Sequence, residues 1–420
     1  MGLSTNREIF KVKNLIPRVP RRRLLEDKKN LYGLDLSFKG YDTQHSTHAL
    51  HTYVAAINPP LAKSLIDTYV PSGENILDPF SGGGGVLVEA MLSGRPSAGA
   101  EINPLGVIIA KAKTTYIASE EILRIGEEIM TRARKIKGVD HLKRDPKISF
   151  WFKEKNLDEL IAMSESLKRQ DLDHELENLF MAILSATIRD VMLTYRGEVR
   201  LRKLQGSHYD KFNPDTFSAF KKRYILATER VPELPRSNRP DIELRDVRNL
   251  PFSDGQFYAV ITSPPYADDK NGVGYFQFSK NMLAFLGFSP EQVKEYRSLF
   301  LGTITKNKVP PKSKSLLNSL ENVKKEKPEK YDEGVAFYSD YAKGLAEMVR
   351  VIRKRIIIVI GNRVLARTEF DNVAITVELL KNLGVELEHH YTRSLNKKRI
   401  PNLGSDGGGI NLEHVLVFKK

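Results

Sequence analysis

The sequence predicts an α/β protein in which a mostly parallel, doubly wound sheet is interrupted by a block of helices. A short apolar run at 75–77 leads into a glycine-rich turn and a helix-like segment at 86–92, and a second strand candidate follows at 97–100. Strand, glycine-rich turn, helix and strand are the opening of a doubly wound sheet. Residues 117–239 then carry apolar side chains at helical spacing, and strand-like runs return from residue 242 onward.

The remaining elements follow from the same periodicities. Apolar residues at helical spacing predict helices over 122–136, 157–167, 176–193, 338–352 and 372–383. Short apolar runs predict strands at 242–244, 257–262, 355–360, 385–390 and 414–418. The segment 306–330 is rich in Lys, Pro and Ser, which is typical of a mobile loop.

We expect three parts along the chain. Residues 1–40 form a basic arm, and residues 41–116 together with 240–420 form the α/β domain. Residues 117–239 form a helical insertion, which is a candidate for recognising the target.

The charge balance indicates a polyanionic partner. The chain of 420 residues has 66 Lys and Arg against 52 Asp and Glu, a net charge of +14, which favours nucleic acid. It has no cysteine, so disulfides, thiolate metal sites and thiol nucleophiles are excluded. No apolar run reaches the roughly 18 residues of a membrane span. We therefore expect a cytoplasmic, nucleoid-associated protein.

The first motif is D-P-F-S-G-G-G-G at residues 78–85, between the first strand and the first helix. Glycines allow a tight turn and close approach to a ligand, and the helix N-terminus favours an anionic group. No Lys-Ser or Lys-Thr follows, so the turn is not a Walker A loop. Glu101 ends the next strand candidate, where a carboxylate accepts hydrogen bonds from ribose hydroxyls. Together these features predict an adenosine-type cofactor.

The second motif is S-P-P-Y at residues 263–266, directly after the strand candidate 257–262. Two prolines at a strand end impose a rigid, extended turn without backbone donors. Such a turn presents the Ser263 hydroxyl and the Pro264 carbonyl as fixed acceptors, and the Tyr266 ring as a stacking face. This arrangement suits the amino group of a base that has been flipped out of a duplex.

The two motifs, in this order, resemble those of the amino-methylating DNA methyltransferases, and S-P-P-Y resembles the cytosine-N4 type in particular. The resemblance covers roughly residues 41–420, and it is weaker outside the two motifs. The chain departs from the family where His-Pro-Tyr-Pro-Ala-Lys-Phe is common: it has H-T-Y-V-A-A-I at 51–57, without the Lys. Tyr258 also replaces the usual Asp before the catalytic strand.

The resemblance implies a Rossmann-like sheet of the class I methyltransferases with a helical insertion, and S-adenosylmethionine as cofactor. The residues that it assigns to cofactor binding are Asp78, Pro79, Phe80, Gly82, Gly84, Glu101, Ile102, Asp246 and Val247. The catalytic loop that it implies consists of Ser263, Pro264, Pro265 and Tyr266. The substrate would be double-stranded DNA with a flipped cytosine, and a cognate restriction endonuclease would be the natural partner.

The absence of cysteine excludes methylation at carbon five of cytosine, because that reaction needs a thiolate nucleophile. Adenine N6 stays open as a target, although such enzymes usually carry Asp or Asn in place of Ser263. The same motifs are also compatible with an RNA base amino-methyltransferase, and the fold with a DNA-binding subunit that has lost catalysis.

Two further groups of residues stand out. The basic side chains Arg189, Arg196, Arg200, Arg202 and Lys203 form either a DNA-contacting surface or a solvated face. His45, His48 and His51 have a spacing that metal ligands can show. A packed or capping role suits these histidines better, so we expect no metal.

Overall fold

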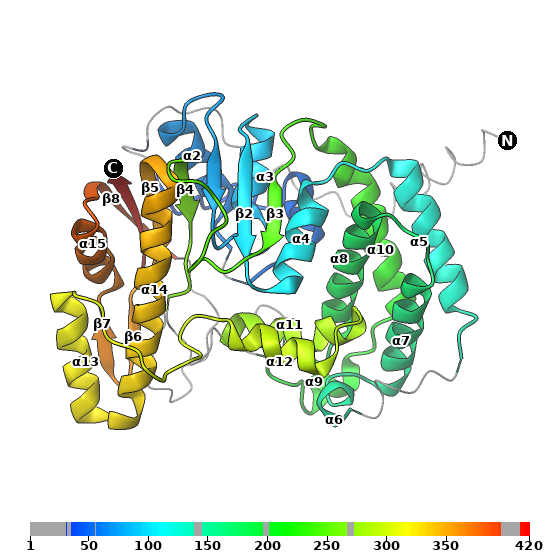
Figure 1. Ribbon diagram of the computed structural model, residues 1–420. Helices are drawn as coiled ribbons and strands as arrows, with labels where there is room; N and C mark the ends of the chain where they lie inside the picture. The colour runs from blue at the N-terminus through cyan, green and yellow to red at the C-terminus, as the bar shows by residue number, and fades with distance from the viewer. Residues whose placement is uncertain are drawn as a thin grey trace.

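The computed structural model describes residues 31, 35–54, 56–137, 145–195, 201–266, 273–395 and 412–420. A central sheet with helices on both faces lies beside a block of helices (Figure 1). None of the helices in these ranges is both long and apolar enough to cross a membrane.

The central sheet has seven strands in the order β3-β2-β1-β4-β5-β9-β8. Their bounds are β1 Ile76–Asp78, β2 Ser97–Glu101, β3 Asp241–Leu244, β4 Phe257–Thr262, β5 Ile352–Ile360, β8 Glu386–Ser394 and β9 Leu412–Lys419. All neighbours pair in parallel except β9, which is antiparallel to both β5 and β8. The strand order reverses between β1 and β4, and ligands of such sheets bind at the carboxyl ends of the strands at this point.

Both faces of the sheet are covered, which explains the continuous apolar run in β5. Ile356 and Ile358 pack with α14 (Tyr331–Val351) and α15 (Asn372–Asn382), whereas Ile357 and Val359 pack against the opposite layer. That opposite layer is formed by α2 (Pro59–Tyr69) and α3 (Gly85–Leu92). Successive strand residues point to opposite faces, so every position of a doubly covered strand must be apolar.

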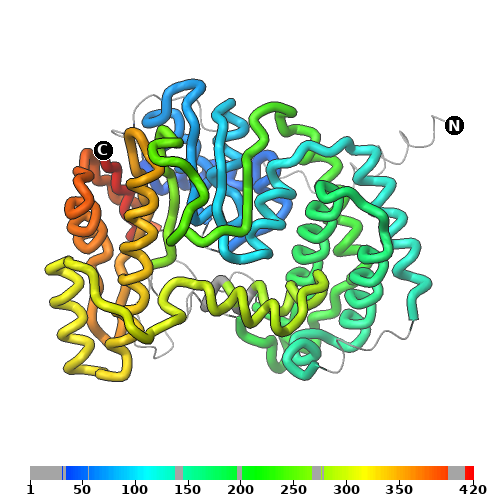
Figure 2. The backbone as a smooth tube through the Cα atoms, in the orientation of Figure 1, coloured from blue at the N-terminus to red at the C-terminus, as the bar shows by residue number. Residues whose placement is uncertain are grey.

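The helical block packs around one apolar core. Its helices are α5 Ser119–Ala133, α6 Pro146–Ser149, α7 Glu154–Lys168, α8 His174–Val191, α9 Ser207–Lys211 and α10 Thr216–Arg230, with the short turn η2 Val231–Glu233. The expected helices at 122–136, 157–167 and 176–193 correspond to α5, α7 and α8. Leu105 and Ile109 of α4 (Pro104–Thr114) belong to the same core. The helical block therefore packs directly against α4, a helix that covers the sheet, and shares its apolar core (Figure 2).

The prediction of a mobile loop at 306–330 is wrong for most of this segment. It contains α13 (Lys314–Glu326) and η3 (Pro328–Lys330), which lead directly into α14. The Ser313 hydroxyl caps α13 by accepting from the Leu316 amide, and Leu316, Leu320 and Val323 are buried along one face. The lysines of α13 lie on its solvent side. The high Lys content of the segment suggested a loop, whereas the spacing of its apolar residues is that of an amphipathic helix.

The other elements complete the chain. They are η1 Ser46–Leu50, α11 Val273–Phe285, α12 Pro290–Ser298, β6 Arg363–Leu365 and β7 Thr368–Phe370. Strands β6 and β7 form a separate two-stranded sheet between β5 and α15.

Candidate cofactor and target-base site

Asp78 joins the two sequence motifs at the carboxyl edge of the sheet. It ends β1, and its Oδ1 accepts hydrogen bonds from the Thr262 hydroxyl at 2.7 Å and from the Phe80 amide at 3.2 Å. Thr262 directly precedes Ser263, so this contact ties the glycine-rich turn to the S-P-P-Y loop. Burial raises the pKa of Asp78 to about 7, although the two hydrogen bonds oppose the shift.

Glu101 closes the glycine-rich turn from the end of β2. Its Oε2 accepts from the Gly82 amide at 2.7 Å and its Oε1 accepts from the Asn103 amide at 2.8 Å. Burial raises the pKa of Glu101 despite these two hydrogen bonds. Each carboxylate oxygen has a second lone pair, so the group retains acceptor capacity for a ribose.

The turn itself accepts only glycine at several positions. Gly82 and Gly84 have φ of +50° and +77°, a region that side chains disfavour. A Cβ atom on Gly83 would lie 2.7 Å from the Cβ of Tyr53, and one on Gly84 would lie 2.8 Å from the Cβ of Ala110. The turn is thus held closely between the Tyr53 segment and α4, with Glu101 beneath it. This donor and acceptor set fits the adenosine-type cofactor expected from the sequence.

Asn103, which sequence reasoning did not single out, completes this side of the turn together with Tyr53 and Ser279. The Asn103 amide nitrogen donates to the Tyr53 hydroxyl at 2.9 Å and to the Ser279 hydroxyl at 2.7 Å. Asn103 also caps α4 by accepting from the Leu105 amide. The only sequence signal was their place beside recognised motifs, because the partners are far apart in the chain.

The S-P-P-Y loop is fixed by side chains from three later elements. The Ser263 hydroxyl lies 3.2 Å from the Tyr266 hydroxyl, which donates to Glu413 Oε1 at 3.2 Å. The Asn372 amide nitrogen donates to the Tyr266 carbonyl at 3.1 Å. The Tyr266 ring is only 6% exposed and packs in the core with Tyr338. The expectation of an open stacking face is therefore wrong for this structure, because the ring is used for packing and its hydroxyl faces Ser263.

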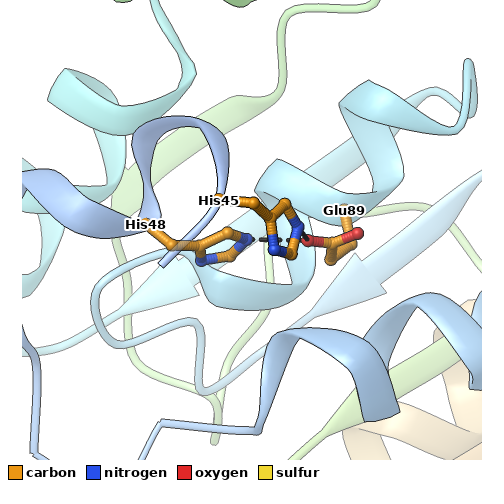
Figure 3. Close-up of side chains that lie close together, drawn as sticks. All are labelled: His45, His48 and Glu89. Atoms are coloured by element: carbon orange, nitrogen blue, oxygen red, sulfur yellow. Dashed lines mark hydrogen bonds and ion pairs between the residues drawn. The ribbon is translucent and has the colours of Figure 1, made fainter. Parts of the chain in front are cut away.

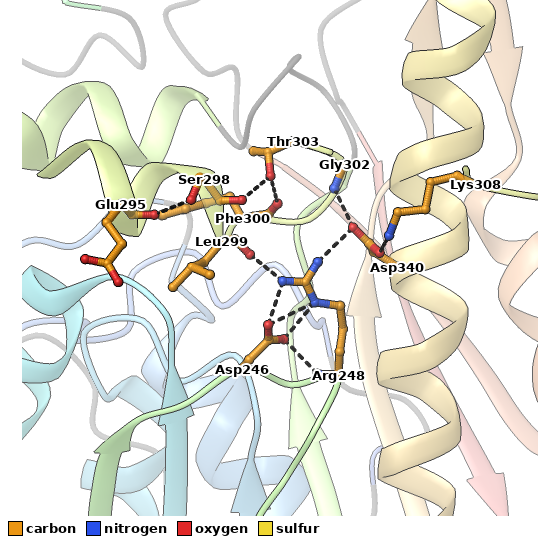
Figure 4. Close-up of polar contacts among 10 residues, drawn as sticks. All are labelled: Asp246, Arg248, Glu295, Ser298, Leu299, Phe300, Gly302, Thr303, Lys308 and Asp340. Carbon is orange, nitrogen blue, oxygen red and sulfur yellow. Dashed lines mark hydrogen bonds and ion pairs between the residues drawn. The ribbon is translucent and has the colours of Figure 1, made fainter. Parts of the chain in front are cut away.

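Asp246 and Val247 follow β3, at the same edge of the sheet. Figure 4 shows the ion pair between Asp246 and Arg248, in which Arg248 Nη2 donates to Asp246 Oδ2 at 2.6 Å. Arg248 also donates to Asp340 at 2.9 Å and to the Leu299 carbonyl at 2.8 Å. The Asp246 carboxylate is thus engaged within the protein, and Val247 is buried against α14. Their contact with the cofactor stays a prediction.

Three members of the predicted basic surface lie in the described residues, and each contacts a group of the protein itself. Arg196 and Arg200 lie outside the described residues. Arg189 donates to the Thr52 carbonyl at 2.5 Å, next to Tyr53. Arg202 stacks on Tyr195 at 4.3 Å, and Lys203 lies 4.0 Å from the centre of the Phe150 ring. Contact of these side chains with DNA stays a prediction.

Two of the histidines before the first motif, His45 and His48, form a largely buried cluster with Glu89 of α3 (Figure 3). The Nε2 atoms of His45 and His48 lie 2.7 Å and 2.8 Å from Glu89 Oε1. Burial would raise the pKa of Glu89, but the hydrogen bonds with His45 and His48 outweigh it and hold the pKa at about 2. His51 takes a different partner, with Nδ1 donating to the Thr52 carbonyl at 3.1 Å.

The spacing within this cluster is that of hydrogen bonds. The three ligand atoms lie within 4.8 Å of one another, which a single ion could bridge. Zinc bonds of about 2.0–2.2 Å in tetrahedral geometry, however, keep ligand atoms roughly 3.3 Å apart. The direct contacts instead fasten η1, and with it the segment leading to Tyr53, onto α3.

Comparison with known proteins finds similarity to DNA methyltransferases. The family model described as DNA methylase, of the N6/N4 type, matches residues 13–112. The Type II methyltransferase M.MvaI of Kocuria varians is 28% identical over 423 residues, which cover 91% of each chain. The Type II methyltransferase M.BsoBI of Geobacillus stearothermophilus is 23% identical over 298 residues, covering 63% of this chain and 57% of that one.

The family match and these relatives support the N6/N4 DNA methylase family for this chain. The protein is a DNA methyltransferase that uses S-adenosylmethionine, as the motifs and the resemblance predict. Among solved structures, a SAM-dependent methyltransferase from Methanosarcina mazei is similar at 9% identity, with a TM-score of 0.31 over 84% of this chain and 94% of that one. The strand order and directions, rather than that neighbour, establish the Rossmann-like fold.

Proposed function

We propose that this DNA methyltransferase modifies the exocyclic N4 amino group of a cytosine flipped out of double-stranded DNA. The observation that carries the proposal is the presence of Ser263, rather than Asp or Asn, at the carboxyl end of β4. Thr262, the residue before it, is bonded to Asp78 of the cofactor turn, so the two motifs face one site.

The cofactor half of the proposal rests on the turn after β1. Asp78, Pro79, Phe80, Gly82 and Gly84 would hold the cofactor from this turn. Glu101 and Ile102 would act from the end of β2, and Asp246 and Val247 from the segment after β3. S-adenosylmethionine supplies an electrophilic methyl group when it is bound.

The catalytic half rests on fixed acceptors. A cytosine amino group has its lone pair delocalised into the ring, so it is a weak nucleophile. Hydrogen bonds from N4–H to the Ser263 hydroxyl and the Pro264 carbonyl would favour the tetrahedral form of the nitrogen and hold it in line. Pro264 and Pro265 keep the loop extended, and Asn372 fixes the Tyr266 carbonyl. Transfer would be direct, since the chain has no thiol for a covalent intermediate.

The macromolecular partner is DNA, and its sequence-specific recognition is assigned to the helical block. Arg189, Arg196, Arg200, Arg202 and Lys203 are the candidate contacts from this block. A pairing with a restriction endonuclease would explain the Type II names of the relatives.

Nucleoside mass spectrometry tests the base assignment. The protein and S-adenosylmethionine are incubated separately with unmodified plasmid DNA and with transfer RNA, and the digests are analysed. We expect N4-methylcytosine in the DNA alone. N6-methyladenine in the DNA would overturn the N4 assignment, and methylation confined to the RNA would overturn the substrate class.

A further inference from the structure

Glu413 lies outside both motifs and contacts Tyr266 of the proposed catalytic loop. It stands at the beginning of β9, the strand that runs against its neighbours. Because β9 is antiparallel to β5, its first residues lie at the carboxyl end of β5, with His414 opposite Ile360. An acidic side chain from near the end of the sequence is thereby brought to the edge that carries Ser263.

The contacts of Glu413 are specific. Its Oε1 accepts from the Tyr266 hydroxyl at 3.2 Å, and its Oε2 lies 3.4 Å from Nε of Arg393. Arg393 is the residue directly opposite on β8, and both side chains are largely buried, at 8% and 13% exposed. A carboxylate acts only as a hydrogen-bond acceptor.

The direction of each hydrogen bond follows from this. A tyrosine hydroxyl has one proton, and Tyr266 donates it to Glu413. In the contact of 3.2 Å between Ser263 and Tyr266, Ser263 must then be the donor. The lone pairs of Ser263 Oγ are consequently left to accept from an incoming amino group. Glu413 thus makes Ser263 an acceptor without touching the base.

We propose that Glu413 is a positioning residue and the final proton acceptor of a Ser263–Tyr266–Glu413 relay. The inference rests on the proposed function, because it requires an amino group at Ser263. As the amino nitrogen forms its bond to the methyl carbon, the pair of the broken carbon–sulfur bond stays with sulfur and the nitrogen becomes cationic. It must then lose one proton.

The relay removes that proton without net change at the two hydroxyls. The base proton passes to Ser263 Oγ, the Ser263 proton passes to the Tyr266 oxygen, and the Tyr266 proton passes to Glu413 Oε1. Ser263 and Tyr266 each end with one proton, the base is neutral, and Glu413 becomes a neutral acid. Glu413 later releases the proton to solvent.

Three substitutions separate this role from a structural one. Glu413→Gln keeps the size of the side chain and an acceptor oxygen for Tyr266 but cannot take up a proton. Glu413→Asp restores the carboxylate, and Glu413→Ala leaves space for added formate. Glu388→Gln is the matched control, because Glu388 of β8 also pairs with an arginine, Arg355 of β5, but at the end of the strands opposite to Glu413.

The measurement is the single-turnover rate on cytosine-containing duplex DNA, with dissociation constants for cofactor and DNA determined in parallel. We expect Glu413→Gln to lower the rate by roughly 10²-fold while both dissociation constants change less than about twofold. Glu413→Asp and formate with Glu413→Ala should each recover part of the rate, and Glu388→Gln should match the wild type.

Two outcomes overturn the relay. One is a rate for Glu413→Gln within about twofold of the wild type. The other is a parallel loss of rate and of both affinities that neither Glu413→Asp nor formate restores. The wild-type product is identified separately, so N6-methyladenine would overturn the base assignment alone. The variants would then be compared on that product, because an adenine amino group loses a proton as well.

Discussion

At the scale of single residues, the site is built from carboxylates that the protein itself engages. Asp78 accepts from Thr262, Glu101 accepts from two backbone amides, and Asp246 is held by Arg248. Each of these residues was expected to contact the cofactor directly. Their internal hydrogen bonds show that they also shape the turns on which a ligand would rest.

Asp78 gives a pH-dependent prediction. Its folded pKa of about 7 lies above the ordinary value of 3.8, so the folded state binds more protons than the unfolded chain between these values. The stability contributed by the protonated acid is present below pH 3.8 and is lost as pH rises through 7. Asp78→Asn should therefore raise the free energy of unfolding at pH 8 by roughly 1–2 kcal/mol.

The same variant should bind the cofactor less tightly by calorimetry, if Asp78 contacts it as proposed. Urea unfolding at pH 5 serves as the control, since the gain should shrink where Asp78 is protonated. A variant that is equally destabilised at both pH values would contradict the assignment of the raised pKa.

At the scale of elements, the cluster of His45, His48 and Glu89 ties the first 3₁₀ turn to α3. The pKa of Glu89, about 2, lies below 4.5, so its contribution to stability is present above pH 4.5 and lost as pH falls through 2. Burial would lower the pKa of His45, but the hydrogen bond to Glu89 and the charge of that carboxylate outweigh burial and raise the pKa. The contribution of His45 is present below 6.5 and is lost as pH rises through the folded value.

Replacing Glu89 should therefore cost most between about pH 4.5 and 6.5. We expect Glu89→Gln to lower the free energy of unfolding by about 2–4 kcal/mol there, because it leaves the largely buried His45 cation without its counter-charge. Glu128→Gln, which removes an exposed pair with Arg124, should cost less than about 0.5 kcal/mol. Denaturant titrations across this pH range check both values, and equal losses in the two variants would refute the role of the cluster.

Helix α13 offers a matched pair of leucines. Leu320 is buried and Leu317 is 44% exposed, three residues earlier on the same helix. Leu320→Ala should cost about 2–4 kcal/mol, whereas Leu317→Ala should change stability by less than about 0.5 kcal/mol. If urea unfolding gave the same small effect for both, the segment 314–326 would not pack as a helix in solution.

Local patterns predict the elements well and their partners poorly. The run from Ile356 to Ile360 indicates a strand covered on both faces, and the structure agrees. The helix at 314–326 was not predicted, because the lysines of this segment dominate its composition. The bond from Thr262 to Asp78 spans 184 residues, and that from Tyr266 to Glu413 spans 147. No local period encodes such contacts, which depend on how the strands are ordered in the sheet.

At the scale of the whole molecule, the excess of 14 positive charges predicts strongly salt-dependent DNA binding. The double variant Arg202→Ala and Lys203→Ala should reduce the slope of log affinity against log salt by roughly 1–2, if both contact phosphates. Lys221→Ala, on α10 and already paired with Glu127, is the control. An unchanged slope in the double variant would remove these two residues from the DNA surface.

The core that α4 shares with the helical block has a consequence for protein engineering. Leu105 and Ile109 face that block, while Asn103 at the start of the same helix contacts Tyr53 beside the glycine-rich turn. A chimaera that grafts the 117–239 segment of a relative with another target sequence would place foreign side chains against Leu105 and Ile109. The graft would therefore need a redesigned α4 surface. If only residues 117–239 were exchanged and α4 were left unchanged, the poor packing would disturb the glycine-rich turn beside α4.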